Sequence, residues 1–193
     1  MKARAKLLSV LAALVGGGAA LLASTQTWIV AILAEVHGAL EVTGTVAAPL
    51  TTPLSFAALA LGLALTVVGP IMRYVFGALA VAIGVGIAAA SWGSALDPPV
   101  SAVAVAVEET TGLAGNDAVR ELVTSLTATA WPFVSLVSGV VIALAGVLVL
   151  LTARSWPRAG RRYDAPTTAA PASRPHDAID SWDDLSRGDD PTR

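Results

Sequence analysis

Few side chains in this sequence could carry out acid–base or metal chemistry. The two histidines, His37 and His176, are far apart, and neither lies at ligand spacing from a second histidine or a carboxylate pair. The acidic pairs at residues 108–109, 183–184 and 189–190 are adjacent rather than helix-spaced, which is typical of solvated charge. The chain has no cysteine, which excludes disulfides and thiolate sites. We therefore expect neither a metal nor another cofactor.

The sequence also carries no motif of a known catalytic or nucleotide-binding class. A phosphate-binding P-loop, a nucleophile elbow and a zincin signature are all missing. The segment GVGIAA, which begins at Gly84, lies inside an apolar stretch without a preceding strand, so it predicts helix packing rather than dinucleotide binding. We expect a protein that is not an enzyme and that does not bind nucleic acid.

The elements that dominate the chain are apolar helices. Hydrophobic residues make up 55% of the sequence and charged residues 13%, against about 25% charged in soluble domains. Crossing a hydrocarbon layer takes about 20 apolar residues. The sequence therefore predicts an all-α membrane protein with four transmembrane helices, at residues 7–24, 53–69, 71–92 and 131–153. The aromatic residues at the predicted span ends, where rings prefer the headgroup layer, are Trp28, Tyr74, Trp92, Trp131 and Trp156.

Charge in these spans is confined to their ends. Arg73, at the junction of the second and third spans, is the one ionisable side chain within them, which argues against a proton relay or an ion-coupled site. Basic residues concentrate in residues 1–6, at Arg73 and in the tail, residues 154–193. The loops at residues 25–52 and 93–130 carry seven acids and one arginine, a net charge of −6. Positive charge stays on the cytoplasmic side, so both termini are predicted to be cytoplasmic. The alternative is a cleaved signal peptide over residues 1–24.

The two outer loops are predicted to contain secondary structure. Apolar and polar residues alternate in the second half of the first loop, which predicts a β-hairpin from Trp28 to Val46 with a turn at residues 37–38. The alternative is a first helix that continues through Ala34. In the second loop, residues 118–126 suggest a short helix. Together the loops could pack as a small extracytoplasmic cap.

Three consecutive glycines, Gly16, Gly17 and Gly18, lie near the middle of the first span. Because glycine destabilises a helix by roughly 1 kcal/mol relative to alanine, the triplet predicts either a helix break lining a small-molecule site or a close helix crossing. Small residues four apart also indicate close packing in a bundle. These triplets are Ala12, Gly16 and Ala20; Ala82, Gly86 and Ala90; and Ser135, Gly139 and Ala143.

The tail after the fourth span changes in composition. Its root carries a basic run that can sit on anionic headgroups, formed by Arg154, Arg158, Arg161 and Arg162. A proline-rich segment follows that is predicted to be disordered. The last residues, 179–192, contain a short motif whose candidate partner-binding residues are Ile179, Trp182, Leu185 and Arg187. The alternative is a solvated acidic end with one stray aromatic residue.

Several segments together resemble a known family. They are STQTW at residues 24–28, AWP at 130–132, RSWPRAGRRY at 154–163 and WDDLSRGDDPT at 182–192. These segments are similar to the actinobacterial tryptophan-associated transmembrane protein family, whose genes lie among tryptophan-biosynthesis genes. The resemblance implies four spans and a bacterial plasma membrane, and it supplies no catalytic residue.

Three hypotheses for function follow. The first is an accessory plasma-membrane protein whose terminal motif recruits a cytoplasmic protein. The second is a small transporter or exporter of an aromatic amino acid or pathway intermediate, as a homo-oligomer, with a cavity at the glycine triplet lined by Ser9, Thr66 or Ser138. The third is an extracytoplasmic binding cap with a concave pocket.

Overall fold

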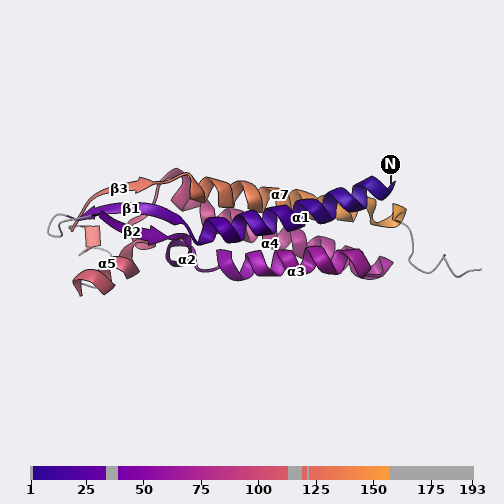
Figure 1. Ribbon diagram of the computed structural model, residues 1–193, viewed down its shortest axis with the longest axis horizontal. Helices are drawn as coiled ribbons and strands as arrows, with labels where there is room; N and C mark the ends of the chain where they lie inside the picture. The colour runs from indigo at the N-terminus through magenta and orange to yellow at the C-terminus, as the bar shows by residue number, and fades with distance from the viewer. Residues whose placement is uncertain (1, 34–38, 113–118, 121, 157–193) are drawn as a thin grey trace, which may run out of the picture. The chain divides into compact units, whose positions relative to one another are not determined.

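A bundle of long helices and a small cap make up the part of the chain that the computed structural model describes, residues 2–33, 39–112, 119–120 and 122–156. The long helices, which run side by side in Figure 1, are α1 (Lys2–Ser24), α3 (Thr51–Val67), α4 (Pro70–Leu96) and α7 (Trp131–Thr152). The elements of the cap, at one end of these helices, are β1 (Thr27–Leu33), β2 (Ala39–Thr43), α2 (Gly44–Ala47), η1 (Val100–Ala102), α5 (Ala104–Thr111) and β3 (Val123–Ala128). A last short helix, η2 (Ala153–Ser155), follows α7 at the other end.

The long helices begin and end where proline and glycine dictate. Gly69 precedes α4, and Pro70 opens it, because proline fits the first helical turn and cannot continue the helix before it. Pro132 lies in the first turn of α7 in the same way. Three helices, α1, α4 and α7, are long and apolar enough to cross a membrane. The fourth apolar helix, α3, has 17 residues, a length of about 26 Å at 1.5 Å per residue.

The bundle is held by close contact between helices that carry small residues. α7 packs against α1 and α4, and α3 packs against the same two helices. At the α4–α7 contact the backbones touch, since a Cβ atom on Gly139 would lie 2.6 Å from the amide nitrogen of Ala88. Nearer the cap, the buried Ser91 hydroxyl donates a hydrogen bond of 2.8 Å to Ser135 on α7. Such contacts give membrane helices the van der Waals packing that replaces a hydrophobic driving force.

The small residues through which α4 contacts α7 are not those of the triplet that the sequence singled out on this helix. Of the predicted triplet on this helix, Ala82 is exposed, and a Cβ atom on Gly86 would face Leu54 of α3 at 3.1 Å. The face toward α7 carries Gly77 and Gly84 instead. Four-residue spacing recurs in several registers along an alanine-rich helix, and the contact forms in the register whose glycines let the backbones approach.

The glycine triplet does not break α1, which is a continuous helix from Lys2 to Ser24. A Cβ atom on Gly16 would lie 2.8 Å from Ile142 of α7, and one on Gly17 would lie 3.1 Å from Leu59 of α3. A Cβ atom on Gly18 would meet nothing within 4 Å. Two of the three glycines therefore serve close helix crossings, and the helix break is not seen.

The cap contains a three-stranded antiparallel sheet in the order β2–β1–β3. The predicted hairpin is present as β1 and β2, although its second strand ends at Thr43 and α2 begins at Gly44. The turn expected at residues 37–38 lies outside the described residues. In the central strand β1, Ile29 pairs with Val42 on one side and with Ala128 on the other.

The third strand corrects the expectation of a helix over residues 118–126. Residues 119–120 and 122 are helical, but residues 123–128 form β3 and pair with β1. The strand contains the β-branched residues Val123, Thr124 and Thr127, which favour extended backbone. The free edge of β1 supplies hydrogen-bond partners that an isolated segment lacks.

Trp28 is the centre of the cap core and is completely buried. Its indole nitrogen donates a hydrogen bond of 2.7 Å to the carbonyl oxygen of Ala23, in the last turn of α1. A Cβ atom on Gly44 would lie 2.5 Å from the same indole nitrogen, so only glycine fits there. Trp28 thus joins α1 to the sheet, and its buried ring does not face the headgroups as its place at a predicted span end suggested.

Candidate functional site

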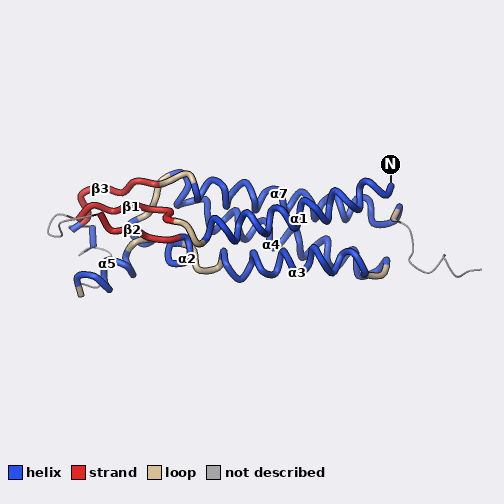
Figure 2. The backbone as a smooth tube through the Cα atoms, viewed as in Figure 1, coloured by secondary structure: helices blue, strands red, loops and turns tan. Residues whose placement is uncertain are grey.

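The end of the bundle away from the cap, called here the basic end, is where α1 begins, α3 turns into α4, and α7 ends (Figure 2). It carries four basic residues with described side chains: Arg4, Lys6, Arg73 and Arg154. The carboxylates among the described residues, Glu41, Asp97, Glu108 and Glu109, all belong to the cap or to the cap end of α4. The described part of the chain is therefore polarised: every described acid lies at the cap end, and of the described cations only Arg120 lies there, just before β3.

Arg73 lies in the first turn of α4 and is only 3% exposed. Its Nη1 atom donates to the carbonyl oxygens of Ala153, at 3.5 Å, and Trp156, at 3.3 Å. These carbonyls follow the end of α7, where the helix dipole is negative and carbonyls lack partners within the helix. Arg73 therefore ties the C-terminal end of α7 to the start of α4.

The Trp156 ring lies beside two cations. The Arg73 guanidinium is 5.3 Å from the centre of the ring, and the Lys6 ammonium is 6.0 Å from it. The indole nitrogen donates to the Thr152 hydroxyl at 2.9 Å. A cation near an aromatic face is worth up to about 2 kcal/mol when both are removed from water.

Trp156 also differs from the expectation that span-end aromatics face the headgroups. It is 3% exposed and packs with Val10, Leu65 and Val149 in the core of the basic end. Trp92 and Tyr74, by contrast, are 60% and 37% exposed. Trp156 differs from these two residues in its partner, because the buried guanidinium of Arg73 on α4 lies beside its ring.

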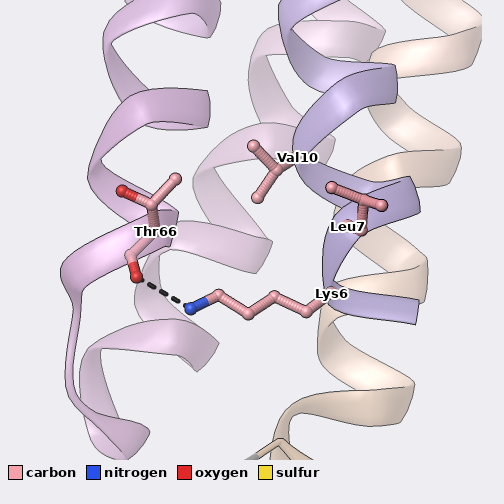
Figure 3. A pocket seen from close by; sticks show the side chains of 4 residues that line it. All are labelled: Lys6, Leu7, Val10 and Thr66. Atoms are coloured by element: carbon pink, nitrogen blue, oxygen red, sulfur yellow. Dashed lines mark hydrogen bonds between the residues drawn. The ribbon is translucent and has the colours of Figure 1, made fainter. Parts of the chain in front are cut away.

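Lys6 closes the end of another helix. Its ammonium group reaches from α1 to α3 and donates a hydrogen bond of 2.7 Å to the carbonyl oxygen of Thr66, as Figure 3 shows. Thr66 lies in the last turn of α3, which ends at Val67. Lys6 thus donates to a carbonyl oxygen at the C-terminal end of α3, as Arg73 donates to carbonyl oxygens at the C-terminal end of α7. The sequence placed both residues at span ends as orientation signals and did not reveal these contacts.

A groove opens between α1 and α3 beside Lys6. It has a volume of about 250 Å³ and is lined by Lys6, Leu7, Val10 and Thr66 (Figure 3). Apart from the ammonium group and the end of α3, its surface is hydrocarbon. Such a groove can hold an apolar chain whose polar end carries negative charge.

The hydroxyls expected to line a transport cavity are engaged within their own helices. Ser9 donates to the Ala5 carbonyl at 3.0 Å, and Ser138 donates to the Val134 carbonyl at 2.7 Å. Thr66 lies at the basic end, where its hydroxyl donates to the Leu63 carbonyl at 2.7 Å. These three residues do not surround the glycine triplet as a polar lining.

The predicted tail sites can be placed only at the tail root. Arg154 is exposed in η2. The remaining residues of the basic run and of the terminal motif lie outside the described residues: Arg158, Arg161, Arg162, Ile179, Trp182, Leu185 and Arg187.

Comparison with family models yields one assignment, which covers nearly the whole chain. The model of the tryptophan-associated transmembrane protein family matches residues 10–192, including the helices, the cap and the tail. The chain belongs to this family. The comparisons with curated proteins and with solved structures find no match. The tryptophan-associated family is a transmembrane family, in agreement with the three long apolar helices.

Proposed function

We propose that this tryptophan-associated transmembrane protein is an accessory protein that recruits a cytoplasmic protein of tryptophan metabolism through residues 179–192. The observation that carries the proposal is the contact of Arg73 with the carbonyls of Ala153 and Trp156. This contact holds the root of the tail against the bundle at the basic end. A binding motif on a tail with an anchored root is confined near the membrane, so a cytoplasmic protein that it binds is concentrated at the membrane surface.

The same proposal requires a membrane topology. We infer four crossings, with the short helix α3 as the second of them and with both termini in the cytoplasm of a bacterial plasma membrane. The separation of charge between the basic end and the cap supports this orientation, because cations near span ends are retained inside. The 17 residues of α3 lie at the lower limit of about 17 for a spanning helix.

The recruitment proposal is tested by changing the motif in the full-length protein. The variant with Trp182→Ala and Leu185→Ala removes two apolar side chains of the predicted motif. Crosslinking in native membranes, followed by identification of the captured proteins, should then lose a protein that the unchanged chain captures. The matched control changes Thr167→Ala and Thr168→Ala in the same tail and should keep that protein. Equal capture by both variants contradicts the proposal.

The structure gives the transporter hypothesis no corresponding support. That hypothesis depended on a break in α1 at the glycine triplet, and α1 is continuous there. It stays a prediction of the sequence, for which tryptophan flux in proteoliposomes would be the measurement.

A further inference from the structure

We infer that the groove between α1 and α3 at the basic end is a binding site for one anionic phospholipid, with the lipid phosphate at Lys6 and an acyl chain along Leu7 and Val10. This inference does not depend on the recruitment proposal. It requires only that lipid surrounds the helices, and it applies to whichever leaflet surrounds the basic end.

The polar part of the site is the Lys6 ammonium group. One of its three N–H donors is used by the Thr66 carbonyl, at 2.7 Å. That bond orients the side chain across the mouth of the groove, as Figure 3 shows. The other donors are free of this bond and can face a phosphate oxygen, with which a lysine forms a charge-assisted hydrogen bond.

Charge at the basic end favours an anion as the ligand. Among the described residues this end carries arginine and lysine side chains, and every described carboxylate lies at the cap end. Near the membrane surface, one lysine or arginine side chain strengthens the binding of an anionic headgroup about fivefold. A zwitterionic lipid offers Lys6 the same phosphate, but its headgroup cation opposes the interaction.

The apolar part of the site favours a lipid over a free anion. Leu7 is 59% exposed and forms one wall, and Val10, one turn further along α1, lines the groove with the 7% of its surface that the core of the basic end leaves exposed. An acyl chain would cover these side chains in line with the headgroup, whereas inorganic phosphate would leave them unused.

The experiment measures lipids retained by the full-length protein in nanodiscs of dioleoyl phosphatidylcholine that contain a minor fraction of dioleoyl phosphatidylglycerol. Native mass spectrometry of the released protein should show one retained phosphatidylglycerol. Lys6→Gln should lower this retention about tenfold, because it removes the charge-assisted hydrogen bond to the lipid phosphate. Arg4→Gln removes an equal charge from an exposed position on the same helix and should leave the retention unchanged.

A second variant tests the apolar part and keeps every charge. Leu7→Trp fills the groove beside Lys6 and should lower the retention to the level of the Lys6 variant. It also serves if Lys6→Gln does not fold, because Leu7 is exposed and makes no hydrogen bond through its side chain.

Three results would overturn the inference. Equal losses in the Lys6 and Arg4 variants would show diffuse attraction to the membrane surface. Equal retention of phosphatidylcholine and phosphatidylglycerol would show no selection for an anion. Displacement of phosphatidylglycerol by inorganic phosphate would show a free-anion site in place of a lipid site.

Discussion

At the scale of single residues, the same amino acid has different roles according to what lies beside it. Gly139 on α7 touches the backbone of α4, and a Cβ atom there would lie 2.6 Å from the Ala88 nitrogen. Gly18 on α1 has nothing within 4 Å of the corresponding position. The first glycine is needed for close packing, whereas the second gives up helix stability without a contact in return.

The two glycines give a paired prediction. Gly139→Ala should lower the stability of the bundle by about 1–3 kcal/mol, because a methyl group would force the α4 and α7 backbones apart. Gly18→Ala should raise it by up to about 1 kcal/mol through helix propensity. Thermal unfolding of both variants in the same detergent measures the two shifts. A fall in both would contradict the assigned role of Gly18.

At the scale of elements, β3 shows how a neighbour decides secondary structure. Residues 123–128 join the sheet because β1 has an open edge, and the pairing places Val30 opposite Thr127. The expected helix survives only at residues 119–120 and 122 among the described positions. A segment with mixed propensity adopts the conformation that satisfies its backbone hydrogen bonds.

The register of β1 and β3 predicts which engineered cysteines can be joined. Cysteines at positions 30 and 127 are direct partners, whereas position 125 faces Ile32. Partners across antiparallel strands have Cβ atoms about 4.5–5.5 Å apart, and a two-residue offset places them about 7–8 Å apart. Mild oxidation should therefore join the Val30→Cys and Thr127→Cys pair much faster than the Val30→Cys and Ser125→Cys pair. Non-reducing mass analysis measures both yields. Faster joining of the second pair would show a different register.

At the scale of the whole described chain, the distribution of charge matches a polarised membrane protein. The basic end holds Arg154, and α5 in the cap holds Glu108 and Glu109. Both Arg154 and Glu109 are exposed, so a label attached to either can report the side of the membrane on which it lies.

Single cysteines in this cysteine-free chain test the proposed topology. In intact cells, Glu109→Cys should react with a membrane-impermeant maleimide, and Arg154→Cys should react only after the cells are permeabilised. The unchanged chain, which has no cysteine, is the control for background labelling. Labelling of position 154 alone in intact cells would reverse the orientation, and labelling of both positions would imply an even number of crossings between them, so that α7 would not span the membrane.

The sequence by itself determined the membrane class, the family, the order of the long apolar helices and the first hairpin, since these depend on local composition, on proline and glycine, and on alternation. The helix ends were less well determined, since α1 begins at Lys2 rather than residue 7 and α4 ends at Leu96 rather than residue 92. The tertiary structure decided what depends on neighbours distant in the chain. It selected the glycines that touch α7, buried Trp28 and Trp156, made residues 123–128 a strand, and joined Lys6 and Arg73 to the ends of α3 and α7. The physical reason is that close backbone contact, edge pairing and the capping of a helix end all require a partner from another segment.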